Sequence, residues 1–397
     1  MTDYVKRRNT LGYYLLFISL GVGLGITGPA LPSLTEQTGS TLGAIGAIFL
    51  VGASGGMLGT ALSGRLFDRI KNGHRVLGLA QLISATLLLI IPLANSLPLL
   101  LVIFFFAGLP GGIINTGANT LLMWTHGKSA GPYVNGLHFA FGLGAFLAPT
   151  IFAQVLNLGG SYQQAYWALA ALALPIGLFL FLLPSSPQLQ TADDAGNLPK
   201  AKLRQNLPVI IVAMLFLFFY VGSELTYGNW IYTYALTLDL ADATSAAYLT
   251  SGFWLSFTIG RAISIPVAAK FKPAQILSVA FLGGVGALAL AIALPNALAV
   301  LWVATVAIGF FMAPVWATGY NLVGQSIQLT ATVSSIIILG DSLGGVVLPW
   351  VAGQAIERFG AQTMPWLVIA SFAVNGLFFL IMLAQGRAKP QVALAGE

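Results

Sequence analysis

Apolar residues dominate the chain in long runs, and polar residues gather in the short stretches between them. A helix needs about 20 residues to cross a membrane, and the runs reach that length. They do not alternate apolar and polar positions, so they do not fit a membrane β-barrel. We predict an all-α membrane protein of twelve transmembrane helices, at 10–33, 42–67, 75–95, 98–124, 131–156, 163–184, 206–236, 244–269, 273–294, 298–323, 331–355 and 362–385.

The composition excludes a soluble enzyme. The chain has 397 residues, of which 57% are hydrophobic and 7% are charged, whereas a soluble domain carries about 25% charged residues. The chain has no cysteine, so it has neither a disulfide nor a thiolate metal site. Its three histidines are scattered along the sequence. We expect no cofactor other than a sodium ion acting as co-substrate.

Basic residues mark one side of the membrane. Twelve spans place both termini on the same side, and sixteen of the seventeen basic residues fall on that side, with Arg358 as the exception. The positive-inside rule makes this side cytoplasmic. The first span is too long and glycine-rich for a cleaved signal peptide, and we expect a bacterial-type plasma (inner) membrane. The acids expected as solvated outer-loop residues are Glu36, Asp239, Asp242 and Glu357.

The chain is predicted to consist of two six-helix halves, at 1–184 and 206–397, joined by a polar cytoplasmic linker at 185–205. Three pairs of segments recur at offsets of 196, 202 and 200 residues, which indicates a parallel duplication. In transporters built from such parallel repeats, the substrate site lies between the halves at the membrane midplane. The pairs are Gly64-Arg65 with Gly260-Arg261, Thr116–Asn119 with Thr318–Asn321, and Leu143–Ala145 with Leu343–Gly345.

These residues resemble a known family. The segment Gly64-Arg65-Leu66-Phe67-Asp68-Arg69, followed by His74-Arg75, is similar to the loop 2–3 signature of the major facilitator superfamily. Three further segments resemble its fucose and glucose–galactose permease branch and the related sodium-dependent glucose transporters. The resemblance implies alternating access and a sugar-like substrate coupled to protons or sodium. The three segments are Asn115–Asn119, Leu137–Ala145 and Tyr220–Gly228.

One departure from the branch concerns the coupling ion. Proton-coupled fucose permeases carry a carboxylate at the position of Asn115, and a second acid in the first span. In this chain Asn115 is a neutral amide, and the first span has no acid before Glu36. The proton pathway of those permeases is therefore not carried over, and sodium and protons both remain open.

Two acids lie deep in the predicted membrane, and both are in the C-terminal half. A buried carboxylate is costly there, so Glu224 and Asp341 are candidates for cation coupling. Glu224 is also a candidate acceptor for a sugar hydroxyl, and Asp341 has hydroxyls nearby that suit sodium. As a structural alternative, Glu224 is an acid hydrogen-bonded between helices. For Asp341 the structural alternative is an interhelical pair with Arg261. The nearby hydroxyls belong to Ser334, Ser335 and Ser342.

Other polar and aromatic side chains are candidates for solute recognition. Asn115, Asn119 and His138 offer donors and acceptors to sugar hydroxyls, and hydrogen bonding within the protein is the alternative for each. Aromatic rings provide an apolar floor for a sugar ring, although packing and interface roles explain most tryptophans in membranes. The aromatic candidates are Tyr227, Trp230, Trp254, Trp316 and Tyr320.

The signature loop supplies the candidates for a conformational latch. The resemblance implies that Asp68, Arg69 and Arg75 hold the inner ends of the two halves together in the outward-facing state, with Arg261 as the counterpart in the second half. Breaking the latch would change the conformational populations without touching the substrate. Simple positive-inside charge is the alternative for Lys71 and Lys272 at this side.

We therefore predict a secondary active transporter for a sugar or similar polyhydroxylated solute, with cation symport. The alternative is a proton-coupled exporter of amphipathic drugs or lipids, which would use the same acids in a larger cavity. A membrane-embedded enzyme is disfavoured because it needs clustered acids or histidines at the membrane surface, whereas the histidines here are scattered and the loops pair acids only at Asp193-Asp194 of the linker. The expected partners are a small solute and membrane lipids, without nucleic acid, and we expect a monomer.

Overall fold

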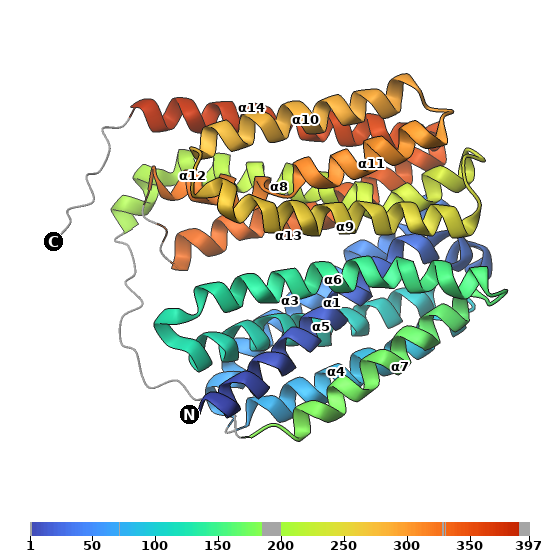
Figure 1. Ribbon diagram of the computed structural model, residues 1–397, viewed down its shortest axis with the longest axis horizontal. Coiled ribbons are helices and arrows are strands. Elements are labelled where there is room, and N and C mark those ends of the chain that lie inside the picture. Colours follow the sequence, from blue (N-terminus) through green and yellow to red (C-terminus); the bar gives the residue numbers. More distant parts are fainter. Residues whose placement is uncertain (1, 71, 185–199, 328, 330, 389–397) are drawn as a thin grey trace. The chain divides into compact units, whose positions relative to one another are not determined.

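The computed structural model is helical apart from turns and short links, and no strand occurs in the residues it describes (Figure 1). The predicted linker at 185–205 lies largely outside those residues. The side chains of Asp68 and Arg69 also lie outside the described part of the chain, although both residues belong to a described helix. The described residues are 2–70, 72–184, 200–327, 329 and 331–388.

Each predicted span corresponds to one long helix or to two helices in succession. Breaks occur at Gly46 in the second span and at Ala313-Pro314 in the tenth. The first six spans correspond to α1 (Asp3–Thr38), α2 (Leu42–Ile45) with α3 (Ala47–Arg69), α4 (Gly73–Ile90) with η1 (Ile91–Leu93), α5 (Leu97–His126) followed by η2 (Gly127–Ser129), α6 (Gly131–Asn157) and α7 (Tyr162–Phe181). The last six correspond to α8 (Lys200–Thr237), α9 (Ala243–Ala268), α10 (Pro273–Ala293), α11 (Leu298–Met312) with α12 (Val315–Gly324), α13 (Ala331–Phe359) and α14 (Thr363–Ala388).

Eleven helical segments within the described residues are long and apolar enough to cross a membrane. The remaining predicted span is α9. Its 26 residues are long enough to cross, but serine, threonine and Arg261 lower its hydropathy. The polar side chains of this helix therefore need partners inside the protein.

The helices form two compact units. The first contains Met1–Thr191, Gly228–Leu255 and Gly353–Ala361, and the second contains Ala192–Tyr227, Ser256–Ala352 and Gln362–Glu397. These units differ from the predicted sequence halves. The second part of α8, the first part of α9 and the end of α13 make their contacts within the first unit.

Small residues allow close helix packing in the first unit. There α3 packs along α5, α1 along α6 and α4 along α7. A Cβ atom at Gly55 or Gly59 of α3 would collide with the α5 backbone, and one at Gly108 or Gly112 of α5 would collide with α3. Such small-residue interfaces bring backbones together where hydrophobicity alone cannot drive helix association in lipid.

The sequence repeat has an equivalent packing contact in each unit. In the first, a Cβ atom at Gly144 of α6 would collide with the carbonyl oxygen of Ile18 in α1. In the second, one at Gly344 of α13 would collide with the carbonyl oxygen of Phe218 in α8. Both residues of the second pair lie 200 positions after those of the first. The duplicated Leu-Gly segment therefore has the same packing role in both units.

In the second unit, α10 packs against α11, α12 and α14. Phenylalanines fill much of the space between these helices and α8. Phe281 of α10 contacts Phe216 of α8 and Phe372 and Phe379 of α14, with ring centroids 4.9–6.4 Å apart. Gly284 of α10 lies directly against Phe372, where a larger residue would not fit. This packing supports α8, the helix that carries Glu224.

Candidate functional site

Glu224 is buried in the middle of α8, with only 7% of its surface exposed. One turn earlier on the same helix, Tyr220 is fully buried. The hydroxyl of Tyr220 donates to the carbonyl oxygen of Met312 at 2.9 Å, and it also makes hydrogen-bonding contacts with Glu224 and Arg261. The carboxylate of Glu224 is therefore held within a polar network inside the second unit.

Arg261 of α9 is the positive group of this network. Its guanidinium lies 4.4 Å from the centre of the Phe257 ring, in a cation–π contact. Its charge acts favourably on the carboxylates of both Glu224 and Asp341, and these two carboxylates repel each other. The residue predicted as a latch thus lies with the two deep acids, as the structural alternative for Asp341 anticipates. Its latch role is not tested by this arrangement and stays a prediction.

Asp341 of α13 is half-buried and accepts a hydrogen bond from an indole. The Nε1 atom of Trp316 in α12 donates to its Oδ2 atom at 2.9 Å. With Glu224 and Arg261, Asp341 completes a cluster of two carboxylates and one guanidinium, which we call the charge cluster. When all three groups are ionised, the charge cluster carries one net negative charge.

Trp316 and Tyr320 form a stacked aromatic pair beside Asp341. Their ring centroids are 5.3 Å apart and the planes differ by 12°. The hydroxyl of Tyr320 donates to Ser334 of α13 at 2.7 Å. Both rings are half-buried, so each keeps some surface on which a solute could pack. The pair and the carboxylate together offer an apolar surface next to a hydrogen-bond acceptor.

The other three aromatic candidates are buried. Tyr227, Trp230 and Trp254 are each at most 2% exposed. The hydroxyl of Tyr227 shares a hydrogen bond of 2.7 Å with Thr305 in the second unit. In the first unit, the Trp230 ring lies 6.2 Å from that of Phe49. These contacts favour packing roles in the conformation described, and solute binding by these residues stays a prediction.

The predicted polar ligands of the first unit lie on α5 and α6. Asn115 and His138 are exposed, and Asn119 is half-buried. The amide of Asn119 donates to the side-chain oxygen of Asn115 at 3.2 Å and to its backbone oxygen at 3.0 Å. The His138 ring meets Phe17 edge-on, with centroids 6.1 Å apart. Asn115 and His138 are therefore accessible for solute recognition, whereas the amide of Asn119 is engaged within its own helix.

The latch segment is only partly described. Helix α3 continues to Arg69, but the side chains of Asp68 and Arg69 are outside the description. Arg75 is exposed in the first turn of α4, where its backbone N–H donates to the capping Asn72 at 3.4 Å. The latch function of these residues stays a prediction.

Two features of the first unit are absent from the sequence-based prediction. His74 is fully buried, with its Nδ1 atom 2.6 Å from the carbonyl oxygen of Pro184 and its Nε2 atom 2.8 Å from the hydroxyl of Tyr13. Since a carbonyl oxygen only accepts, Nδ1 carries the proton. His74 therefore connects α4 to α1 and to the segment that follows α7. Only its position after the signature loop could have indicated this role.

The second feature is a set of contacts at the predicted outer ends of the helices. Glu357, predicted as a solvated outer-loop residue, is exposed but lies near the end of α13. Its Oε2 atom accepts from the N–H of Gly43 at 2.6 Å and from the hydroxyl of Thr41 at 2.7 Å. Nearby, the side chain of Gln354 donates to the carbonyl oxygen of Gly43 at 2.8 Å. We call these four residues the outer clamp. It connects the end of α13 to α2 within the first unit.

Further contacts in the first unit join α6 to the first part of α9. The side chain of Gln154 donates to the hydroxyl of Tyr248, and the hydroxyls of Thr150 and Ser251 lie 3.1 Å apart. In the same region, the rings of Phe152 in α6 and Tyr232 in α8 meet edge-on. These contacts explain why the second part of α8 and the first part of α9 belong to the first unit.

The charge cluster does not resemble a transition-metal site. Among the described residues, no three His, Cys, Asp or Glu side chains converge on one point. A monovalent cation could use Asp341 together with hydroxyl or carbonyl oxygens. Ser342 lies next to Asp341 on α13, and its hydroxyl is 3.5 Å from the carbonyl oxygen of Ile338.

Comparison with known proteins identifies the class. The profile of the Major Facilitator Superfamily matches residues 13–349, so the chain belongs to this superfamily. It is a multi-pass integral membrane protein of a transporter family and not an enzyme.

Individual relatives agree with this class. The chain is 30% identical to a mouse protein named sodium-dependent glucose transporter 1A, over 86% of this chain and 88% of the mouse protein. Its fold matches a D-xylose–proton symporter with a TM-score of 0.76 at 15% identity, covering 96% and 99% of the two chains. A nucleoside transporter, NupG, matches with a TM-score of 0.73 at 14% identity, over 98% and 100%. These two structures show the fold alone.

Proposed function

We propose that the chain moves a sugar or a related polyhydroxylated solute by alternating access, in symport with a cation. The observation that carries the proposal is the pairing of two carboxylates, Glu224 and Asp341, with a single guanidinium, Arg261, which leaves one negative charge unbalanced when both acids are ionised. An unbalanced charge inside a membrane is costly. One sodium ion or one proton would neutralise it, so binding of a cation to Glu224 or Asp341 is favourable by electrostatics alone. The two carboxylates need not bind the cation equally.

The sugar assignment rests on three features. The stacked rings of Trp316 and Tyr320 provide an apolar surface, Asp341 adds an acceptor, and Asn115 and His138 supply accessible donors and acceptors in the first unit. A neutral polyol needs these groups and no fixed counter-charge. The names of the mouse glucose transporter and the xylose symporter support the same substrate class.

Sodium is the cation we favour. The hydroxyl of Ser342, next to Asp341 on α13, offers an oxygen ligand, which a proton does not need, whereas Ser334 and Ser335 lie about two helical turns earlier. Asn115 is an amide where proton-coupled permeases have an acid. The relatives named sodium-dependent support this choice, whereas the symporter with the same fold is named for protons.

The topology is part of the proposal. The distribution of basic residues supports cytoplasmic termini and a plasma (inner) membrane of bacterial type. We propose that a monomer carries out transport in contact with membrane lipids.

Uptake into proteoliposomes tests the proposal. Purified protein would be given labelled glucose or xylose under an inward sodium gradient at equal pH, or under a pH gradient in potassium. We expect accumulation above the equilibrium level only with sodium, and its loss when a sodium ionophore collapses the gradient. Accumulation driven only by the pH gradient would show that the coupling ion is the proton and not sodium. No sugar uptake, together with export of lipophilic cations, would favour the exporter alternative.

A further inference from the structure

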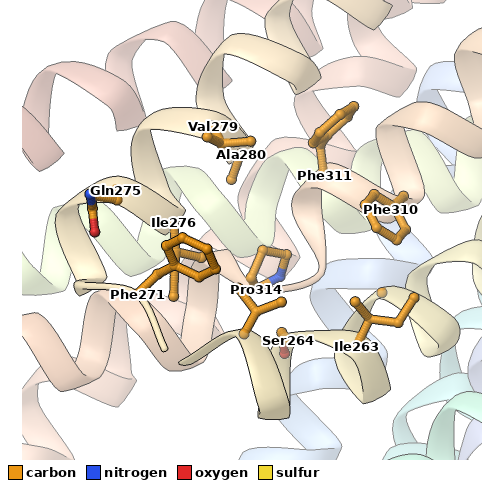
Figure 2. A pocket seen from close by; sticks show the side chains of 12 residues that line it. Ile263, Ser264, Phe271, Gln275, Ile276, Val279, Ala280, Phe310, Phe311 and Pro314 are labelled. Carbon is orange, nitrogen blue, oxygen red and sulfur yellow. The ribbon is translucent and has the colours of Figure 1, made fainter. Parts of the chain in front are cut away.

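A crevice with a cavity volume of about 290 Å³ lies among α9, α10, α11 and the link to α12, in the second unit (Figure 2). Its lining is almost entirely apolar, with Phe271 near one end and Phe310 near the other. Ser264 is a polar exception, but its hydroxyl already donates to the carbonyl oxygen of Arg261 at 2.7 Å. The crevice therefore suits a hydrocarbon chain better than a hydrated solute.

The crevice opens on a lipid-facing surface. Val279 of α10 is 61% exposed, Phe271 is 53% exposed and Ile263 of α9 is 43% exposed. All three line the crevice. Large apolar side chains exposed along membrane-spanning helices face the acyl chains of the bilayer. A lipid can thus enter the crevice from the side.

Positive charge lies at one end of the crevice. Phe271 is flanked in sequence by Lys270 and Lys272, which are both exposed in the short link between α9 and α10. No acidic residue occurs anywhere in α9, this link or α10. Lysines at the end of a membrane helix reach toward the headgroups while their stems stay in apolar surroundings, and each attracts an anionic headgroup.

We propose that the crevice binds an acyl chain of an anionic phospholipid, whose phosphate pairs with Lys270 and Lys272. The apolar lining holds the chain, and the two ammonium groups select the headgroup. Gly260 also lines the crevice and directly precedes Arg261 of the charge cluster. The bound lipid therefore rests against the helix that carries the only cation of that cluster.

Native mass spectrometry of the detergent-purified protein tests this site. Phosphatidylglycerol and phosphatidylcholine of equal chain length would be titrated separately, and the apparent Kd of the first bound lipid compared. We expect phosphatidylglycerol to bind the wild type about 5- to 25-fold more tightly, because each of the two lysines contributes up to about a fivefold gain. The double variant Lys270→Ala, Lys272→Ala should bind both lipids equally.

Two further variants test the crevice itself. Val279→Trp should fill the crevice from α10 and weaken the binding of both lipids. Ile263→Trp should do the same from α9. Leu282→Trp is the matched control, since Leu282 is 77% exposed on the same helix but does not line the crevice. Lys6→Ala with Arg7→Ala removes two charges from the first unit and should leave binding unchanged.

The proposal is overturned if the wild type binds the two lipids equally. It is also overturned if Val279→Trp and Ile263→Trp keep wild-type affinity for phosphatidylglycerol, once thermal denaturation has shown that both variants are folded. If the double variant Lys6→Ala, Arg7→Ala loses as much affinity for phosphatidylglycerol as the variant Lys270→Ala, Lys272→Ala, the effect comes from net charge in general and the site is likewise rejected.

Discussion

The backbone N–H of Gly43 donates a hydrogen bond of 2.6 Å to the carboxylate of Glu357, which lies 314 residues later in the chain. The same oxygen accepts from Thr41, the residue that caps α2. A Cβ atom at Gly43 would collide with the Glu357 carboxylate, so a larger residue there would displace that side chain from the contact. The outer clamp therefore joins one end of α13 to the start of α2. Under the alternating access that we propose, we expect it to open once in each transport cycle.

Removing the clamp should favour the open form of the predicted outer side. Glu357→Ala deletes two hydrogen bonds to a charged acceptor. Because the group is exposed, we expect a loss of about 1 kcal/mol, or roughly a fivefold change in population. The chain has no cysteine, so spin labels at Ser40→Cys and Phe359→Cys can report the distance between these ends by electron paramagnetic resonance.

The Glu357→Ala variant should increase the long-distance population in that measurement. Glu36→Ala is the matched control, because Glu36 is exposed at the same predicted side and has no part in the outer clamp. An unchanged distance distribution in Glu357→Ala would show that the clamp does not govern opening.

The charge cluster makes a second prediction about coupling. Glu224→Gln and Asp341→Asn each remove one negative charge while keeping hydrogen-bonding capacity, so each leaves a neutral cluster that no longer requires a cation. Both variants should lose accumulation of solute against its gradient. Equilibrium exchange of solute should persist in at least one of them.

The measurement is uptake into proteoliposomes under the driving gradient, followed by counterflow without a gradient. Glu36→Gln and Asp239→Asn are the controls, because both acids are exposed at the membrane surface. Normal accumulation by both cluster variants would reject the assignment of coupling to these acids.

The sequence was sufficient to predict the helices and the two deep acids. Long apolar runs leave the backbone no alternative to helix in a membrane, and an isolated acid such as Glu224 stands out because it is costly there. The burial of Trp230 could not be predicted, because helical periodicity shows on which side of the helix a residue lies but not which neighbouring helix covers that side. The sequence suggested Arg261 as a partner for Asp341 only as an alternative, and did not suggest it for Glu224. That partnership and the contact of Glu357 with Gly43 depend on tertiary packing, which no local pattern encodes.

Trp316 gives a third prediction, concerning solute affinity. Its ring stacks on Tyr320 and its indole N–H binds Asp341. Trp316→Phe keeps a ring but leaves the carboxylate without its donor, and Trp316→Ala removes both. If the solute packs on this pair, the KM of uptake should rise about tenfold in Trp316→Ala, from roughly 1.5 kcal/mol of aromatic contact, and less in Trp316→Phe.

Initial rates of uptake over a range of solute concentrations measure this effect. Trp366→Ala is the control, since Trp366 is 60% exposed on α14 of the same unit and lies outside the stacked pair. A KM equal to that of the wild type in Trp316→Ala would remove the aromatic pair from the solute site.

The repeated glycines give a fourth prediction, which tests whether the duplication has one structural purpose. Gly144 and Gly344 each lie against a carbonyl oxygen of a neighbouring helix, in equivalent positions of the two units. Alanine at either position must push two helix backbones apart. Because the packing is rigid, we expect a loss of roughly 1–3 kcal/mol in each variant, seen as a lower temperature of thermal unfolding in detergent.

The chain supplies a control for each unit. Gly23 of α1 and Gly286 of α10 have no heavy atom within 4 Å of an added Cβ, so alanine fits at both. There the higher helix propensity of alanine should raise stability slightly. The prediction is therefore opposite in sign for Gly144→Ala and Gly23→Ala, and again for Gly344→Ala and Gly286→Ala. If all four variants unfold at the same temperature, close approach at the duplicated segment does not hold either unit together, and the two sequence segments resemble each other for another reason.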